Sequence, residues 1–187
     1  MPLSFSRDGV AEPAVEGGLE RLPGLEVVPD APEDDPYRKA MEKAGRLLSR
    51  RPQSRLEIQQ KLRTGGFEPD VIERVIARLE SLKLLDDAAF AGQWVQERGA
   101  RKGPRALRAE LARKGVSREI GDEAVASSGI DEQEVALKLA SRWVGRVSGR
   151  PLRDQAARVF RMLVGRGFSY EVAEEATKAV LPPEGWD

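Results

Sequence analysis

Three glycines, Gly66, Gly115 and Gly167, stand 49 and 52 residues apart, and one apolar pattern surrounds each of them. The spacing of four residues before each glycine is that of an amphipathic helix. A glycine after the last turn, followed by an apolar residue, is typical of a left-handed helix end. The apolar residues at positions −8, −4, +1 and +5 are Ile58, Leu62, Phe67 and Val71; Leu107, Leu111, Val116 and Ile120; and Val159, Leu163, Phe168 and Val172. The sequence therefore predicts three copies of one helical unit.

Helix-start signals occur at matching places in the three copies. Ser54 and Glu57 form a capping box, Ser117, Asp131 and Ser169 are N-cap residues, and Pro104 and Pro151 suit first helical positions. No segment alternates with the period of two that a half-buried strand needs. The predicted helices span residues 37–51, 54–65, 69–83, 87–100, 104–114, 118–127, 131–147, 151–166 and 170–181.

We expect an all-α protein of three tandem three-helix repeats that form an elongated curved array. Units of this size bury their apolar faces on their neighbours. The expected boundaries are 37–84, 85–129 and 130–187, the last with a short C-terminal tail. Residues 1–36 contain two basic and nine acidic residues and six prolines, without periodicity, which predicts a disordered acidic arm.

The composition excludes most enzyme chemistry. The chain has no Cys and no His, which removes thiol nucleophiles, imidazole bases and the usual zinc ligands. Asp86 and Asp87, with Glu80 nearby, could suggest a divalent metal, but adjacent carboxylates diverge and helix capping explains them better. We expect no catalysis, no metal and no cofactor. No apolar run spans a membrane and no secretory signal is visible, so we expect a cytoplasmic protein.

Basic and acidic residues alternate in blocks that follow the repeat. Basic residues dominate 38–63, 98–118 and 142–166, and acidic residues dominate the segments between them. A positive face along the repeats would suit a polyanion such as DNA, RNA or a protein filament on DNA. Aromatic residues make up only 5% of the chain, and Phe90, Trp94, Trp143 and Phe160 suit the core, so we expect salt-dependent, sequence-independent contacts.

The central segment resembles the RecX regulators of the RecA recombinase. The matching residues are Leu85-Asp86-Asp87-Ala88-Ala89-Phe90-Ala91, Trp94, Arg98, Lys102-Gly103, Leu107, Glu110-Leu111 and Lys114-Gly115-Val116. Leu47-Leu48 and Arg51 to Glu57 resemble the opening helix pair, and Gly165 to Phe168 the closing turn. The resemblance covers about residues 37–181. One departure is Lys83-Leu84, where the family often has Gly-Tyr before Leu-Asp-Asp.

The resemblance implies a non-enzymatic modulator that binds RecA along its DNA filament and inhibits its recombinase and ATPase activities. It further implies a cytoplasmic protein. We expect a monomer with weak, sequence-independent DNA affinity. Asp86, Asp87, Phe90, Trp94 and Gly115 are expected to be structural. From the charge blocks, the expected RecA or DNA contacts are Arg50, Arg51, Arg55, Arg98, Arg101, Lys102, Arg105 and Arg108.

Two alternatives remain open. Each unit could act like a helix-turn-helix relative in a general nucleic-acid-binding array that competes for DNA, although the third helices are acidic and DNA would repel them. A scaffold independent of RecA would bind neither partner. The acidic arm could cover the basic face or simply aid solubility.

Overall fold

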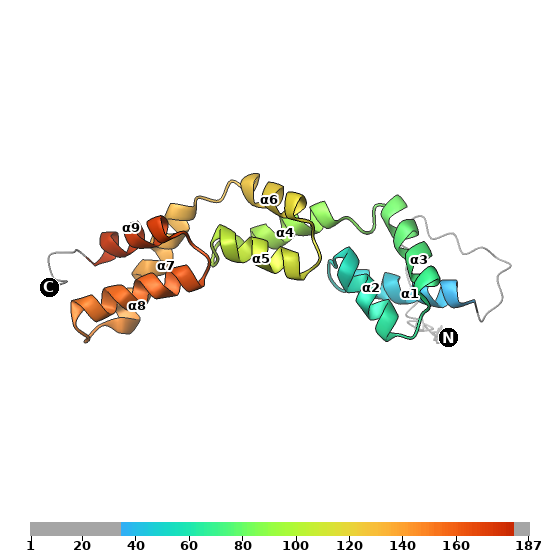
Figure 1. Cartoon of the computed structure of the whole chain (residues 1–187), viewed down its shortest axis with the longest axis horizontal. Coiled ribbons are helices and arrows are strands. Elements are labelled where there is room, and N and C mark those ends of the chain that lie inside the picture. The colour runs from blue at the N-terminus through green and yellow to red at the C-terminus, as the bar shows by residue number, and fades with distance from the viewer. Residues whose placement is uncertain (1–34, 182–187) are drawn as a thin grey trace, which may run out of the picture. The chain divides into compact units, whose positions relative to one another are not determined.

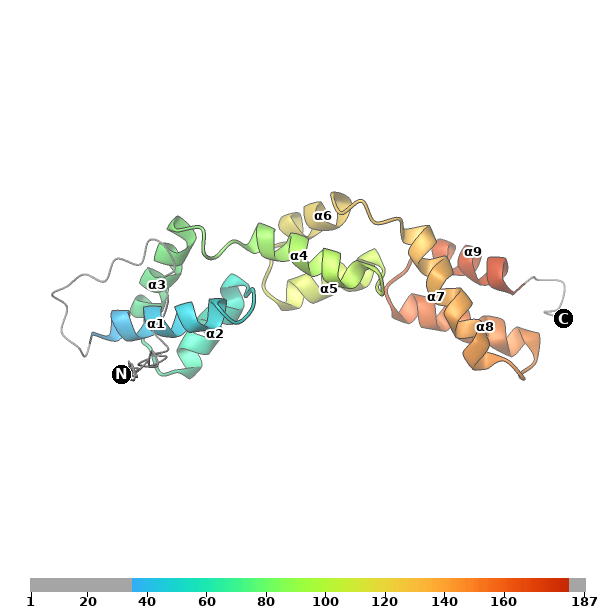
Figure 2. The same ribbon diagram turned by 180° about the vertical axis from the view of Figure 1, so that it is seen from behind.

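The computed structural model describes residues 35–181, all within one structural unit. These residues form nine α-helices and no strand (Figures 1 and 2), which confirms the all-α prediction. The predicted disordered arm lies almost wholly outside the described residues. The helices are α1 (Pro36–Leu48), α2 (Arg55–Thr64), α3 (Pro69–Ser81), α4 (Asp87–Gly99), α5 (Pro104–Arg113), α6 (Arg118–Ala126), α7 (Glu132–Val147), α8 (Leu152–Gly165) and α9 (Tyr170–Val180).

Side-chain caps start the helices where the sequence predicts them. Ser54 and Glu57 form the reciprocal capping box of α2. The side chains of Ser117, Asp131 and Ser169 accept backbone N–H groups of the first turns of α6, α7 and α9. The prediction for Pro151 is wrong by one residue, because Pro151 is the N-cap of α8 and the helix begins at Leu152. The first helix also ends earlier than predicted, at Leu48 rather than residue 51.

The anchor glycines end the second helix of each repeat, as predicted. Gly66, Gly115 and Gly167 have φ of 81°, 80° and 87°, in the left-handed region that suits glycine. The next backbone N–H donates back to Leu62 (3.4 Å), Leu111 (3.1 Å) or Leu163 (3.2 Å), the bond that defines a Schellman motif. In the second and third repeats the apolar residue that follows, Val116 or Phe168, is buried in the same core cluster as that leucine.

Each repeat builds its own core from the stripe that the sequence predicts. Ile58 and Leu62, and likewise Val159 and Leu163, are fully buried, and Leu107 and Leu111 are nearly so. In the third repeat α7 packs on α8 and α9 around Leu163 and Phe168. Burial of such aliphatic side chains contributes about 1.5–3 kcal/mol each.

The second helices of successive repeats meet end to end. The buried hydroxyl of Ser54, at the start of α2, donates to the carbonyl of Lys114 at the end of α5 (2.6 Å). The backbone N–H of Gly103, at the start of α5, donates to the carbonyl of Arg166 at the end of α8 (2.9 Å). Carbonyls left free at one helix end are thus satisfied by the start of another, and the negative end of one helix dipole lies beside the positive end of the next.

The same junctions explain why two of the anchor glycines tolerate no side chain. A Cβ on Gly115 would overlap Leu56 of the first repeat, and a Cβ on Gly167 would overlap the backbone of Ala106 in the second. Gly66 has nothing within 4 Å of the same position among the described residues. At Gly115 and Gly167, glycine therefore permits both the left-handed turn and the close contact between neighbouring repeats.

Lys83 has a positive φ of 57°, which among the described residues is otherwise confined to glycines. It follows the end of α3, and Leu84 N–H donates to the Leu79 carbonyl (3.0 Å), so this turn is a further Schellman motif with lysine at the left-handed position. The geometry accounts for the glycine that the RecX resemblance puts there. We expect Lys83→Gly to raise the free energy of unfolding by about 1 kcal/mol, because it removes the left-handed penalty. Urea titration measures this. Lys83→Ala keeps the penalty, so an equal gain in that control would contradict the explanation.

Candidate anion-binding surface

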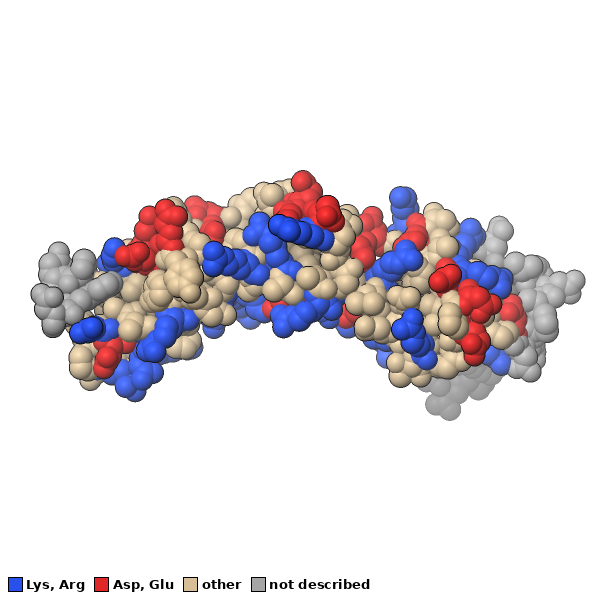
Figure 3. Space-filling view, in the orientation of Figure 1, with Lys and Arg blue, Asp and Glu red and all other residues tan. Residues whose placement is uncertain are grey.

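In the second and third repeats, basic residues predominate on the second helices and acidic residues on the third helices. Figure 3 shows acidic side chains over α6 and α9 and basic side chains over α5 and α8. The acidic set comprises Glu119, Asp122 and Glu123 on α6 and Glu171, Glu174 and Glu175 on α9. The basic set comprises Arg105, Arg108 and Arg113 on α5 and Arg153, Arg158 and Arg161 on α8. The second helices therefore present mostly positive charge and the third helices mostly negative charge.

At the junction of the first and second repeats, the candidate cation Arg55 is already paired. Arg55 donates its backbone N–H to Asp87 (2.8 Å) and its guanidinium to Glu80 (2.5 Å). Asp86 caps α4 by accepting from Ala88 and Ala89. Together the three carboxylates act as caps and ion-pair partners of α2 and α4, and no group of three or more possible metal ligands occurs among residues 35–181.

Glu57 is the centre of this junction. Its carboxylate, in a side chain 12% exposed, accepts from Lys114 (2.6 Å) and Arg51 (3.2 Å). Burial alone raises the pKa of Glu57, but the bonds from Lys114, Arg51 and the Ser54 backbone outweigh it and lower the pKa below its ordinary value. The charged form is thus favoured by folding.

This lowered pKa predicts how stability depends on pH. A carboxylate whose pKa falls on folding stabilises above its unfolded value, near 4.5, and loses that contribution as pH falls through the folded value. We expect Glu57→Gln to cost about 1 kcal/mol at pH 7 and to cost less below pH about 4, as urea midpoints at the two pH values will show. Glu42→Gln is the control, because that carboxylate is 47% exposed on α1. A Glu57→Gln cost that does not shrink in acid would contradict this account.

A second half-buried carboxylate, Glu110, organises the α4–α5 pair. It accepts from the Trp94 indole (3.1 Å) and from Lys102, and lies 4.0 Å from Arg98. The Arg98 guanidinium lies over the Trp94 ring, 3.8 Å from its centroid. Phe90 is 5% exposed and contacts Trp94 at 5.6 Å between ring centroids. Trp94 therefore works as a packing surface for cations and not as a free stacking ring.

The structure separates the eight predicted contact residues into two groups. Arg51, Arg55, Arg98, Lys102 and Arg108 pair with carboxylates, the last with Asp122 at 2.6 Å. Arg50, Arg101 and Arg105 are exposed and carry no ion pair among residues 35–181. The paired group is held internally, so the unpaired group offers the stronger attraction to an external anion.

Arg101 and Arg105 lie together at the junction of the second and third repeats. The Arg101 carbonyl accepts from the Arg166 guanidinium (3.1 Å), and the Arg105 backbone N–H donates to the Gly167 carbonyl (3.1 Å). Burial, followed by the charges of neighbours including Arg98 and Arg166, lowers the pKa of Lys102. Glu110 pairs with Lys102, so the positive charge here that carries no ion pair in the described chain is that of Arg101 and Arg105.

The contact residues predicted from the sequence do not include the arginines of the third repeat, which the structure also places on the surface. Arg142 and Arg146 on α7, Arg150 in the connection, and Arg153, Arg158 and Arg161 on α8 are exposed and without an ion pair in the described chain. The sequence does indicate a basic surface in the third repeat, because residues 142–166 hold seven arginines and one acidic residue, Asp154.

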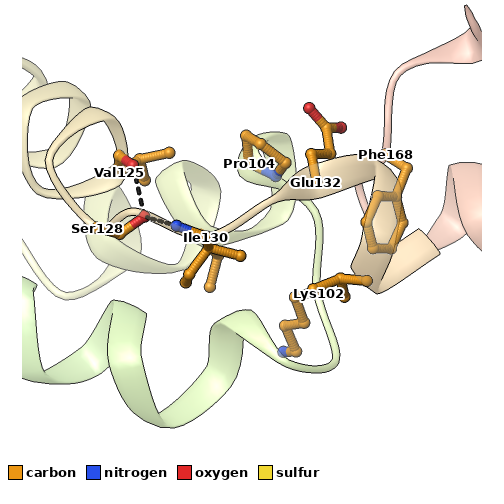
Figure 4. A pocket seen from close by; sticks show the side chains of 9 residues that line it. Lys102, Pro104, Val125, Ser128, Ile130, Glu132 and Phe168 are labelled. Carbon is orange, nitrogen blue, oxygen red and sulfur yellow. Dashed lines mark hydrogen bonds between the residues drawn. The ribbon is translucent and has the colours of Figure 1, made fainter. Parts of the chain in front are cut away.

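The cavity at the junction of the second and third repeats does not resemble a catalytic pocket (Figure 4). Apolar side chains such as Pro104, Ile130 and Phe168 line most of it. The Ser128 hydroxyl donates to the Val125 carbonyl (2.8 Å) and accepts from Ile130 N–H (3.3 Å), and Lys102 is held by Glu110. Within the described residues, no helix combines the length and apolarity that crossing a membrane requires.

Comparisons with known proteins match this arrangement repeat by repeat. Family models for the first, second and third three-helix domains of RecX match residues 40–79, 86–125 and 131–177. The regulatory protein RecX of Mycobacteroides abscessus is 36% identical, over 98% of this chain and 94% of its own. That of Thermobifida fusca is 35% identical over 90% of both chains. A crystal structure of RecX from Lactobacillus salivarius has a TM-score of 0.69 at 25% identity, covering 78% of this chain and 97% of that one.

Proposed function

The chain belongs to the RecX family of regulatory proteins, and from this premise we propose that it binds RecA on its DNA filament and inhibits the recombinase and ATPase activities. The observation that carries the proposal is the unpaired positive charge on the second helices of a chain matched throughout its body by RecX models. A RecA filament on DNA presents both phosphates and protein carboxylates to such a surface. The relatives are named regulatory proteins, which fits a role without catalysis.

Within this function, Arg101 and Arg105 are the main contacts among the predicted residues. They are exposed, unpaired and fixed at their backbones to the third repeat. Arg50 adds a weaker contact, and the paired cations contribute to shape and to long-range attraction. The protein acts as a cytoplasmic monomer without a cofactor, and its affinity for naked DNA is weak and independent of sequence.

The second candidate function is competition for DNA by a general nucleic-acid-binding array. The exposed arginines of α8 favour it, whereas the acidic residues on α6 and α9 oppose a helix-turn-helix mode in which third helices enter the groove. Competition requires enough protein to coat the DNA, whereas filament regulation does not.

A binding experiment separates the two functions. Single-stranded DNA on beads, either naked or coated with RecA of the same organism and a non-hydrolysable ATP analogue, is incubated with the protein at about 0.15 M salt. Filament recognition predicts at least tenfold tighter retention on RecA-coated DNA. Equal or weaker retention on coated DNA would contradict it and favour competition.

A further inference from the structure

The exposed face of α8 is an arginine surface without internal partners. Gln155, Ala156, Val159 and Leu163 are buried against α7 and α9, so the opposite face is exposed. That face carries Arg153, Arg158 and Arg161, which we call the α8 arginine face, visible as basic side chains over α8 in Figure 3. Asp154 is its single acidic residue and forms no ion pair in the described chain.

No carboxylate in the described chain forms an ion pair with these three arginines. The Arg161 Nε donates to the Ala157 carbonyl one turn earlier (3.0 Å), which anchors the side chain on α8 while its terminal N–H groups stay available. In contrast, the ion pairs of the third repeat involve lysines, Lys138 with Glu134 and Lys178 with Glu174. A planar guanidinium fork suits bidentate contacts with phosphate.

An exposed aromatic ring borders this face. Tyr170, the first residue of α9, is 62% exposed and contacts Phe160 of α8 at 5.8 Å between ring centroids. Phe160 is seven residues from Arg153, so the two lie on the same side of α8. An exposed ring supported by a second ring offers a surface on which an apolar partner or a base can pack.

We propose that the α8 arginine face and Tyr170 bind single-stranded DNA, with the arginines on successive phosphates and a base stacked on Tyr170. The inference rests on the proposed function for its choice of ligand, since a filament regulator meets single-stranded DNA at filament ends and gaps. Phosphate contacts supply most of the affinity and make it dependent on salt. Stacking adds preference for unpaired bases without sequence specificity.

Fluorescence anisotropy with labelled oligo-dT tests this on the full chain without RecA, across about 0.05–0.3 M salt. Arg153→Glu/Arg158→Glu/Arg161→Glu should weaken binding about 100-fold near 0.1 M salt and reduce the slope of log K against log salt by about 2, since each lost contact removes about 0.7. Arg63→Glu/Arg78→Glu/Lys83→Glu makes the same charge change on exposed residues of the first repeat and should have less than a tenth of that effect.

The stacking contact is tested separately. Tyr170→Ala should weaken oligo-dT binding about tenfold with an unchanged salt slope, and Tyr170→Phe should bind like the parent protein. Circular dichroism melting checks that each variant is folded. Two results would overturn the proposal. One is an equal loss of oligo-dT affinity in the α8 charge reversal and in the control reversal of the first repeat; the other is a salt slope of log K that does not change in the α8 variant.

Adding RecA distinguishes an acidic protein surface from single-stranded DNA as the ligand of the α8 arginine face. If the α8 reversal weakens filament binding but leaves oligo-dT affinity intact, the α8 face binds protein and the inference is wrong. Retention on RecA-coated beads by the parent protein tests the proposed function independently, so failure of one does not imply failure of the other.

Discussion

Gly167→Ala will lower the free energy of unfolding by about 3 kcal/mol or more, among the largest losses we expect from a single methyl group in this chain. Two costs add. A φ of 87° costs alanine about 1–2 kcal/mol, and the new Cβ would overlap the Ala106 backbone of the second repeat, whose displacement costs about 1–3 kcal/mol. The shift also strains the bond from Arg105 N–H to the Gly167 carbonyl. Urea unfolding followed by circular dichroism measures the loss.

Two other glycines separate these costs. Gly149 has the same φ of 87° but nothing within 4 Å of the place that a Cβ would occupy, and Gly66 occupies the equivalent turn of the first repeat, also with open space. Each should lose only about 1–2 kcal/mol on mutation to alanine, the backbone cost alone. If all three variants lose the same stability, the close approach between the second and third repeats does not stabilise the fold.

Arg101→Glu/Arg105→Glu will raise the protein concentration needed for half-maximal inhibition of RecA ATPase about 100-fold. Both side chains are exposed and unpaired, and reversing them places like charges against an acidic or phosphate surface, which costs several kcal/mol. A cost of about 3 kcal/mol corresponds to a change of about 100-fold. The assay is ATP turnover by RecA on single-stranded DNA near 0.1 M salt.

The matched control for this variant is Arg63→Glu/Arg78→Glu, which alters the net charge equally on α2 and α3. It should change the inhibitory concentration less than threefold. Because the Arg101 and Arg105 contacts to the third repeat use main-chain atoms, the double variant should keep its melting temperature. Unchanged inhibition by a folded double variant would remove both arginines from the contact surface.

Local chemistry made most of the fold predictable from the sequence. Ser54, Ser117 and Ser169 cap helices through their own first turns, and Gly66, Gly115 and Gly167 end helices through their own φ, so each signal acts within a few residues. Pro151 was misplaced by one residue because proline suits the N-cap as well as the first turn here. Short-range rules therefore located the helices to within three residues at each end.

The candidate surface was less predictable because ion pairing depends on contacts between residues distant in sequence. Arg55 meets Glu80, and Lys114 meets Glu57 from 57 residues away. A basic block in the sequence does not distinguish such paired cations from free ones like Arg101. For Asp87 the sequence favoured a helix-start role over a metal site, but it did not indicate that Asp87 accepts a backbone N–H from α2 or that burial raises its pKa.

The most direct test of the proposed regulation is the ATPase rate of RecA from the same organism on single-stranded DNA, titrated with this protein. Filament regulation predicts loss of ATP turnover at amounts well below one protein per RecA monomer. Loss of turnover only when the protein is abundant enough to coat the DNA, or no loss at all, would contradict it.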